Sequence, residues 1–503
     1  MRFATTLLIL TQLAFSAFSQ PGFNRIYDLG YPRNQFRNLI VYQDTIIAFG
    51  IARTDTFPDL QCLFLARFDS SGTAIDSKLI CDSIGDYLSM NINWAEIIST
   101  SDGGYALTAA SIIRNNGVFV KLSQDLSVEF IQEYPDSVNL VEIYNSIVEL
   151  PDGYLLGGYV QRPNYLQDAF LRKVDKQGNS VWFSYYGEYD VVDFFSNYYK
   201  LNDSIVAYVG GYILNQNILD GRGPWLALVN VQDGEVTKEW RPSGSYLEWL
   251  HYIYPISSKN WLLYGKKAFQ ANPTKVMPFW ALVDTSFNVI DTRLFGPGLN
   301  VSNFLWDMKP TPDGSFITVG QVNAKNPNTE PTAVYGWVYK VSPDLDSLWS
   351  LQVIPPVGDP KNYGGYLGGV GILSSGNMIA GGYANSIEGI HPWLVKFTPD
   401  GCIDTLWCAT TPVWEPQELE WHKQPVVQLY PNPAQGFVTV ELPDYGTEAT
   451  LELFSVEGRV CLRQSVPNSG SIDVSQLVPG YYVCRVTMGE SQAAYYAPLI
   501  IAR

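Results

Sequence analysis

The chain has 503 residues, of which 46% are hydrophobic, 14% are aromatic and only 16% are charged. This length exceeds one compact core of the usual domain size, so we expect several domains or a repeat array. The composition excludes an intrinsically disordered chain, which needs low hydrophobicity and high charge. The formal net charge of −17 excludes the basic patches that nucleic acid and anionic membrane surfaces require.

The N-terminus has the three parts of a secretory signal peptide. Arg2 supplies the positive charge, apolar residues dominate 7–15, and Ala17-Phe18-Ser19 offers small residues for cleavage. We therefore predict a signal peptide over residues 1–19 and a mature chain that is secreted or held at the outer cell surface. The apolar run is too short to span a bilayer and no later segment is longer, so we expect no transmembrane segment.

Six cysteines in an exported chain make disulfides plausible. Closeness in sequence suggests three pairs, although six cysteines allow fifteen pairings. The suggested pairs are Cys62 with Cys81, Cys402 with Cys408, and Cys461 with Cys484. No Cys-x-x-Cys spacing occurs, so the sequence predicts no zinc site, no other metal site and no cofactor.

An apolar strand that ends in a tight turn recurs about every 55 residues. Its copies end at Phe68, Leu122, Val174, Val229, Val283, Val341 and Phe397. Turn dipeptides such as Asp152-Gly153 and Asp313-Gly314 recur in step with this strand and favour two-residue hairpins. A glycine near the end of the preceding strand recurs too, which indicates a bulge or a close backbone approach. These glycines are Gly50, Gly157, Gly210, Gly265, Gly320 and Gly381.

Four strands per repeat, seven repeats and no helical periodicity predict an all-β fold, a seven-bladed β-propeller over residues 20–410. The segment Arg25–Leu29 has the pattern of a stray fourth strand that could complete the last blade and close the ring. A β-solenoid or a stack of β-sandwiches would be the alternatives. The repeats loosely resemble those of bacterial propeller proteins but lack the WD and kelch signatures, so no functional residue carries over from them.

Propeller geometry divides the connections between strands into two faces. The first-to-second and third-to-fourth connections are uniformly tight, and the remaining ones are long and irregular. The long loops comprise 53–61, 161–167, 214–223, 266–277, 323–335 and 355–363. Because long loops on a rigid scaffold usually carry function, we expect a ligand to bind on this face or at the mouth of the channel.

Aromatic residues in or beside the long loops are the best binding candidates. They could stack on sugars or anchor a protein, and the alternative is packing between blades. The candidates are Tyr165, Trp249, Trp306, Tyr335, Tyr363 and Tyr366.

The sequence offers little for catalysis, and we assign no catalytic residue. Three histidines, His251, His391 and His422, are scattered, and no HExxH, GxSxG or P-loop motif occurs. Carboxylates near the starts of first strands could meet in the channel for glycoside chemistry, or they could be surface groups. These are Glu96, Glu142, Asp190, Asp193, Glu248 and Asp307.

The repeat stops before residue 426, and a Pro-, Glu- and Trp-rich stretch at 411–425 is predicted as a linker. Short alternating runs follow, which predict a small Ig-like antiparallel β-sandwich over 426–503. Its motifs, in chain order, are Tyr430-Pro431-Asn432-Pro433, Leu451–Val460 with Gly458-Arg459, Ile472–Leu477, Gly480-Tyr481, and an apolar last strand ending in Arg503.

In order and spacing, these tail motifs resemble the C-terminal sorting domain of type IX secretion, also called the Por system. The resemblance implies export across the inner membrane, passage of the outer membrane guided by the tail, and the type IX secretion machinery as partner. The sorting motif residues would be Tyr430, Pro431, Asn432, Pro433, Gly458, Arg459, Gly480 and Tyr481.

The sequence leaves three hypotheses for the segment in front of the tail. The first is a non-enzymatic propeller that binds a glycan or a protein. The second is an extracellular hydrolase or lyase acting on polysaccharide through channel carboxylates, and the third is a structural surface component. Two inward carboxylates in a cleft would favour the enzyme, and an aromatic surface would favour binding.

Overall fold

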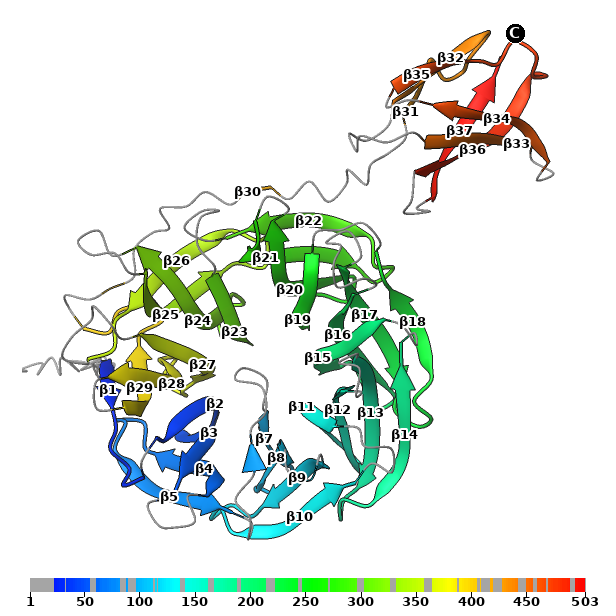
Figure 1. The fold of residues 1–503 in the computed structure, drawn as a ribbon. Helices are drawn as coiled ribbons and strands as arrows, with labels where there is room; N and C mark the ends of the chain where they lie inside the picture. Colours follow the sequence, from blue (N-terminus) through cyan, green and yellow to red (C-terminus); the bar gives the residue numbers. More distant parts are fainter. Residues whose placement is uncertain are drawn as a thin grey trace, which may run out of the picture. The chain divides into compact units, whose positions relative to one another are not determined.

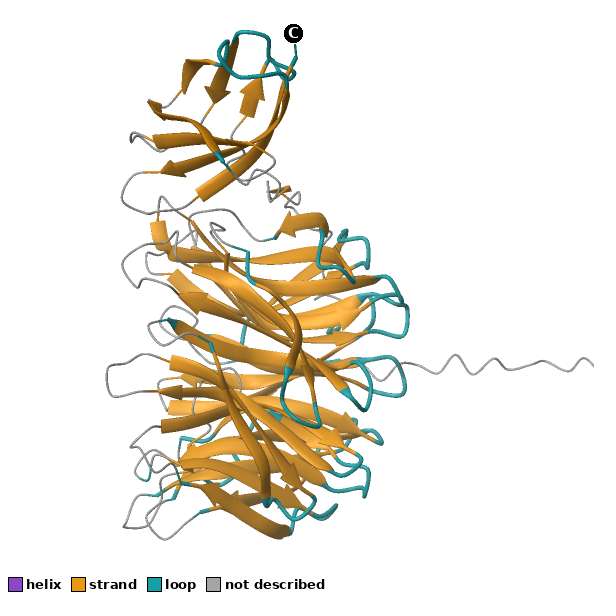
Figure 2. Ribbon diagram, turned by 90° about the vertical axis from the view of Figure 1, so that its right-hand side faces the viewer, coloured by secondary structure: helices purple, strands orange, loops and turns teal. Residues whose placement is uncertain are grey.

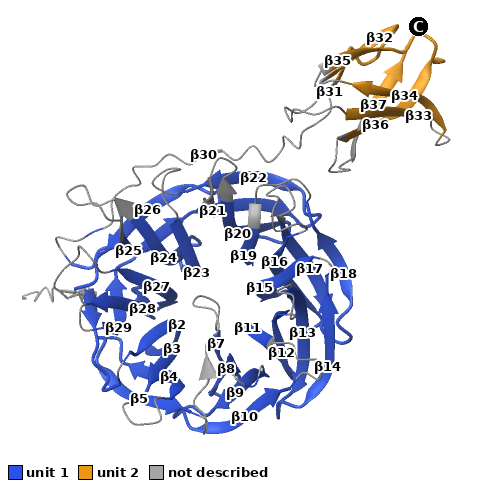
Figure 3. Cartoon of the chain, viewed as in Figure 1, with its two compact units in different colours: residues 1–419 blue, residues 420–503 orange. Residues whose placement is uncertain are grey.

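A computed structural model gives the architecture, and within residues 22–502 it describes all but short stretches. The stretches left out are 32, 55–59, 82–86, 89–95, 112–113, 115, 136–140, 162–166, 188–190, 214–221, 243–246, 270–271, 296–302, 326–331, 357–363, 387–388, 405–407, 409–416, 419–427, 442–448, 456–458, 467–468 and 489–493. The predicted signal peptide lies outside the described residues. The chain divides into two compact units, residues 1–419 and 420–503 (Figure 3).

The described part of unit 1 consists of seven antiparallel sheets arranged in a ring around a central axis (Figure 1). Blade 1 comprises β2 (Gln35–Tyr42), β3 (Thr45–Arg53), β4 (Gln61–Phe68) and β5 (Ala74–Ile80). Blade 2 comprises β6 (Tyr87–Leu88), β7 (Ile97–Ser99), β8 (Tyr105–Ser111), β9 (Asn116–Leu122) and β10 (Val128–Tyr134). Blade 3 comprises β11 (Val141–Leu150), β12 (Gly153–Gln161), β13 (Gln167–Asp175) and β14 (Ser180–Tyr186).

The remaining four blades repeat this order. Blade 4 comprises β15 (Val192–Lys200), β16 (Ile205–Ile213), β17 (Arg222–Asn230) and β18 (Val236–Trp240). Blade 5 comprises β19 (Leu247–Pro255), β20 (Asn260–Phe269), β21 (Asn272–Asp284), β22 (Val289–Leu294) and β30 (Gln417–Glu418). Blade 6 comprises β23 (Asn303–Pro310), β24 (Phe316–Lys325), β25 (Thr332–Val341) and β26 (Ser347–Val353). Blade 7 comprises β27 (Gly365–Ile372), β28 (Met378–Ser386), β29 (Gly389–Phe397) and β1 (Phe23–Ile26).

The N-terminal strand closes the ring. Phe23 of β1 pairs with Lys396 of β29, and Ile26 pairs with Trp393. The strand predicted at Arg25–Leu29 therefore exists, but it begins at Phe23 and ends at Ile26. The predicted fold class, an all-β propeller followed by a small sandwich, is confirmed. The described part of the chain contains no helix, and so none with the length and apolarity needed to cross a membrane (Figure 2).

The tight turns gather on one face, which we call the turn face (Figure 2). Glycines such as Gly103 and Gly178 have φ of 85° and 82° there, which only glycine adopts at little cost. In three blades a buried third-strand lysine also reaches the aspartate of the first turn. The pairs are Lys121–Asp102 at 2.9 Å, Lys173–Asp152 at 2.8 Å and Lys340–Asp313 at 2.6 Å.

Blades 4 and 5 lack this ion pair. They have Leu228 and Leu282 at the lysine position, and Asn202-Asp203 and Lys259-Asn260 at the turn. The turn aspartate of blade 4, Asp203, pairs instead with Lys200 at 2.7 Å. In blade 7 the buried Lys396 donates to the Ser70 carbonyl oxygen at 2.9 Å. The ion pair of blades 2, 3 and 6 supplies the counter-charge that a buried ammonium needs.

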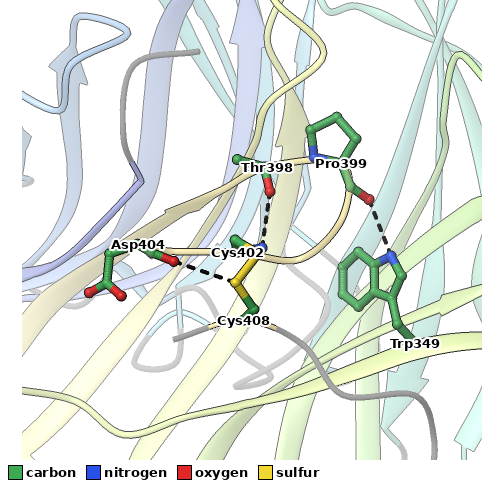
Figure 4. Close-up of a disulfide and its surroundings, with 6 residues drawn as sticks. All are labelled: Trp349, Thr398, Pro399, Cys402, Asp404 and Cys408. Atoms are coloured by element: carbon green, nitrogen blue, oxygen red, sulfur yellow. Dashed lines mark hydrogen bonds between the residues drawn. A yellow bond between two sulfur atoms is a disulfide. The ribbon is translucent and has the colours of Figure 1, made fainter. Parts of the chain in front are cut away.

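Two of the three suggested disulfides are present, Cys62–Cys81 and Cys402–Cys408. The second follows blade 7, where the Cys402 amide donates to Thr398 Oγ1 and Trp349 Nε1 donates to the Pro399 carbonyl oxygen (Figure 4). The suggested Cys461–Cys484 pair is wrong: Cys461 is exposed and Cys484 is buried, and both are free thiols.

The sheet order of the tail explains the absence of that third bridge. Cys461 and Cys484 lie on strands that pair with opposite sides of the same middle strand. Two strand spacings are about 9.6 Å, which is beyond the Cα separation that a disulfide spans.

Unit 2 is a sandwich of two antiparallel sheets. One sheet has the order β31 (Gln428–Tyr430), β32 (Phe437–Glu441) and β35 (Ser469–Asp473). The other has the order β34 (Val460–Val466), β33 (Ala449–Ser455), β36 (Gly480–Met488) and β37 (Ala494–Ile501). A single apolar core fills the space between them, with Val438, Leu451 and Ile472 fully buried. Of the predicted linker at 411–425, the structure describes only Gln417–Glu418, which pairs with β22.

Candidate functional site

The channel is lined by the first strands of the blades, and β-bulges determine which side chains face it. In blades 3 to 6 the pairing register of the first strand shifts at Asn145, Ser196, His251 and Trp306. All four of these residues line one pocket in the channel. A bulge adds one residue to a strand and redirects its side chain, so each blade contributes a different group to the channel.

The recurring glycines lie opposite these bulges, as their position in the sequence predicted. A Cβ atom on Gly210 would lie 1.9 Å from the Phe194 carbonyl oxygen, and one on Gly320 would lie 1.9 Å from that of Phe304. No larger residue fits at such a distance. The glycines therefore mark, in the sequence, where each blade contributes to the channel.

Asp307 is the hydrogen-bonding centre of one side of the channel. Its Oδ1 accepts from Tyr252 OH at 2.9 Å, the Met308 amide at 2.8 Å and Lys309 Nζ at 3.1 Å. Its Oδ2 accepts from the Val370 amide at 2.9 Å. These donors come from blades 5, 6 and 7, and Asp307 is only 1% exposed. Asp307 therefore joins three blades.

Glu96 has the corresponding position on the other side. Its Oε2 accepts from the Ile147 amide of blade 3 at 3.0 Å. Burial raises the pKa of Glu96 to about 7, against the opposite effect of the Lys309 ammonium. Burial works to lower the pKa of Lys309, but Asp307, Tyr254 and Glu96 together outweigh it and hold that pKa above its usual value. The channel thus contains two carboxylates and one ammonium.

The pocket between these groups is narrow. Its free space is about 20 Å³, which is room for about one water molecule. Two polar oxygens at its wall, Asn145 Oδ1 and Ser196 Oγ, have no hydrogen-bond partner among the described residues, and neither has the indole N–H of Trp306. Burial and the Lys266 ammonium hold the pKa of His251 well below its usual range, so this ring is neutral at pH 7.

Aromatic rings form two adjacent runs at the end of the channel opposite the turn face, where first strands begin. We call Phe194, Trp249, Phe304, Trp306, Tyr366 and Tyr383 the aromatic arc. Successive ring centroids lie 5.3 Å apart for Phe194–Trp249, 5.0 Å for Phe304–Trp306, 5.9 Å for Trp306–Tyr366 and 5.1 Å for Tyr366–Tyr383.

Two cations belong to this arc. Lys266 Nζ lies 3.1 Å from the Trp249 ring centroid and 5.9 Å from that of Phe304, so it links blades 5 and 6. The Arg37 guanidinium lies 5.2 Å from the Tyr383 ring centroid and continues the arc into blade 1. Trp249, Phe304 and Tyr383 are half-buried and keep part of their surface accessible. A surface of this type suits sugar rings or an apolar protein side chain.

The structure brings together three of the six aromatic candidates. Trp249, Trp306 and Tyr366 lie in the arc, although Trp306 is 8% exposed and Tyr366 only 2%, so both also pack between blades. Tyr335 is separate and packs against the core between blades 5 and 6. Tyr165 and Tyr363 lie outside the described residues.

Some of the carboxylate candidates also face the channel, and others do not. Glu96 and Asp307 face the channel, but Glu142 forms a 2.8 Å ion pair with Arg172 within blade 3. Asp193 is fully buried, with Arg241 at 3.5 Å. Asp190 lies outside the described residues, as does the Glu248 side chain. Sequence reasoning missed Lys309, Tyr252 and Lys266, although the glycines opposite the bulges could have located their neighbourhood.

Several solved structures resemble the chain at low similarity. A neuraminidase-like protein of A/little yellow-shouldered bat/Guatemala is 11% identical, with a TM-score of 0.37, over 75% of this chain and 96% of that one. The AfRom2 CNH domain is 8% identical, with a TM-score of 0.39, over 74% and 98%. A mutant of Synechocystis apocarotenoid oxygenase is 10% identical, with a TM-score of 0.40, over 73% and 88%. No curated protein matches the sequence.

The tail gives a specific match. Residues 428–501 match the family described as "Secretion system C-terminal sorting domain". The matched segment begins with β31 and ends with β37, so it includes every strand of the sandwich in unit 2. The resemblance noted in the sequence is thereby confirmed. Residues 428–501 are a C-terminal sorting domain of type IX secretion, which implies that the chain is exported to the outer cell surface or the medium.

Proposed function

We propose that the protein is an exported, non-enzymatic binding protein whose propeller takes a glycan or protein ligand at the aromatic arc. In this proposal the signal peptide at 1–19 directs the first step of export, and the sorting domain, through the type IX machinery, directs the second. The observation that carries the binding role is the arc itself, in which Trp249, Phe304 and Tyr383 are half-buried and Lys266 lies beside two of these rings.

The hydrogen bonds of the channel carboxylates, and the small space beside them, favour a binding role over a catalytic role. A general acid or nucleophile must reach a substrate atom. Asp307 already accepts four hydrogen bonds within the protein, and the free space beside it holds about one water. A sugar ring does not fit in that space. The carboxylates therefore serve to hold the blades together.

The arc has the accessible groups that the channel lacks. Trp249 and Phe304 each keep part of a ring exposed, and Lys266 lies between them. Rings of this kind contribute binding energy through apolar contact, and an adjacent cation adds attraction to polar or acidic groups on the ligand. In this proposal the long loops predicted from the sequence flank the arc and contribute variable contacts to the ligand.

The test is a binding screen of the purified full-length chain against glycan and protein panels. We expect at least one ligand to bind, and Trp249→Ala and Phe304→Ala to weaken it about tenfold each, as for residues central to an interface. Tyr185→Ala is the matched control, because this aromatic is 47% exposed on the outer strand β14, far from the arc. Polysaccharide cleavage that Glu96→Gln abolishes would instead establish the hydrolase or lyase.

A further inference from the structure

Lys267 is a half-buried lysine near the end of β20 that lies opposite the turn face. In the sheet of blade 5 it pairs with Met277 of β21, which is buried. Burial lowers the pKa of the Lys267 ammonium below its usual value. Among the described residues, none gives this ammonium a hydrogen-bond acceptor, a carboxylate or an aromatic ring. Lys267 therefore loses water on folding and gains no contact with the described residues in return.

The buried lysines that the structure describes in unit 1 do have partners. Three of them pair with turn aspartates, namely Lys121, Lys173 and Lys340. The fourth, Lys396, donates to the Ser70 carbonyl oxygen at 2.9 Å. Partners for Lys267 are not scarce in the composition, because the chain has 49 acidic residues against 32 basic ones. A desolvated charge that lowers stability without a counter-charge indicates a role toward another molecule.

The position of Lys267 connects it with the aromatic arc. The residue before it, Lys266, lies opposite Trp249 in the pairing of β19 with β20, and Lys266 Nζ is 3.1 Å from the centroid of that ring. Successive residues of a strand point to opposite faces of their sheet, so the two lysines lie on the two faces of β20. The end of blade 5 thus carries two cations beside the half-buried rings of Trp249 and Phe304.

This combination of cations and rings determines the chemistry of a matching ligand. The ammonium groups attract anionic substituents, and the half-buried rings favour apolar faces. An acidic polysaccharide carries both in its repeating units, since each sugar ring has a face of C–H groups next to its carboxylate or sulfate. An acidic peptide supplies the charges but not the apolar faces. The observations therefore favour the sugar polymer.

We propose that the ligand of the aromatic arc is an acidic polysaccharide, and that Lys267 and Lys266 bind its anionic substituents. The polymer crosses the end of blade 5, where each ammonium pairs with one substituent while Trp249 and Phe304 contact the sugar rings. Binding supplies the counter-charge that Lys267 lacks in the free protein. This inference rests on the proposed function of the arc.

The experiment measures binding of the purified full-length chain to polygalacturonate and to the same polymer with its carboxylates methyl-esterified. We expect the charged polymer to bind about tenfold more tightly, and salt to weaken its binding through screening. Lys267→Met should weaken polygalacturonate binding about tenfold. Lys259→Met is the matched control, because it removes an exposed charge in the turn before β20, and it should bind like the wild type.

Two further polymers identify the anionic group. Dextran sulfate that binds more tightly than polygalacturonate, with the same loss in Lys267→Met, would support the proposal with sulfate as the substituent. Poly-glutamate that binds more tightly than either sugar polymer would overturn the proposal in favour of an acidic peptide. Failure of all the acidic sugar polymers to bind, or equal affinity of Lys267→Met and the wild type, would also overturn it.

Thermal unfolding separates ligand binding from a structural role. Because Lys267→Met removes a desolvated charge, this variant should unfold at the same temperature as the wild type or higher while it binds less. A lower unfolding temperature would show that Lys267 serves the fold and would overturn the inference. If a neutral glycan or a protein binds instead, and Trp249→Ala weakens that binding, the proposed function stands without the acidic ligand. Absence of binding to every panel would refute both.

Discussion

The turn face and the channel both bury charged side chains, but they do so in opposite ways. On the turn face the cation is buried and its aspartate is half exposed, and the arrangement repeats in three blades. In the channel the Asp307 carboxylate is buried and Glu96 is partly buried, and the six blades that line the pocket contribute different residues. Repetition on the turn face indicates a role common to the three blades that have the pair. Variation in the channel indicates that the ring is held together by contacts between particular blades.

The largest expected effect comes from removing the channel centre. Asp307→Ala leaves the half-buried Lys309 ammonium without its counter-charge and removes hydrogen bonds to blades 5 and 7, so it should lower the free energy of unfolding by about 3 kcal/mol. Urea unfolding followed by tryptophan fluorescence reports the propeller, because residues 428–503 contain no Trp. The exposed Asp344→Ala should change stability by less than about 0.5 kcal/mol. Equal losses of stability in Asp307→Ala and Asp344→Ala would show that the channel carboxylate contributes no more than a surface carboxylate.

The channel should also make stability depend on pH. The folded pKa of Glu96, about 7, lies above its unfolded value, so its contribution is fully present below about pH 4.5 and is lost as pH rises through 7. Between about pH 5 and pH 8 the wild type should therefore lose about 3 kcal/mol relative to Glu96→Gln. Parallel stability curves for the two proteins would contradict this prediction.

A smaller loss of stability is expected on the turn face, and a second substitution should restore it. Asp313→Ala leaves Lys340 without its partner and should cost about 1–2 kcal/mol, since water reaches the half-exposed aspartate and screens the pair. Lys340→Leu combined with Asp313→Asn removes both charges of the pair and should restore stability to within about 1 kcal/mol of the wild type. A double variant less stable than Asp313→Ala would show that the blades are not interchangeable here.

The smallest effect tests the unpartnered oxygens of the channel. Ser196 Oγ is buried without a partner among the described residues, so Ser196→Ala should leave stability unchanged or raise it by up to about 1 kcal/mol. Thr318→Val is the control, because its buried hydroxyl donates to the Tyr339 carbonyl oxygen at 3.1 Å and its loss should cost about 1 kcal/mol. Thermal unfolding of both variants measures the difference.

The fold could be predicted from the sequence because its signals are local and repeated. Neighbouring residues alone identify the turn glycines and aspartates, the ends of the third strands and the strand before Gln35. The tail could be recognised for the same reason. The channel could not, because Asp307 contacts Tyr252 and Val370 only once three blades are in place. Likewise, nothing local in the sequence shows that Cys461 and Cys484 lie on strands separated by β33.

The pairing of β1 with β29 has a consequence for how the chain matures. β1 is synthesised first, and its partner is the last strand of the ring, so a nascent propeller has an open seam until blade 7 is complete. Contacts this distant in sequence form late in folding, because the loop-closure entropy must be overcome first. A protease that trims the chain beyond Phe23 would remove the strand that closes the ring and reopen the edge of blade 7. The first few residues of the propeller therefore decide whether the last blade stays folded.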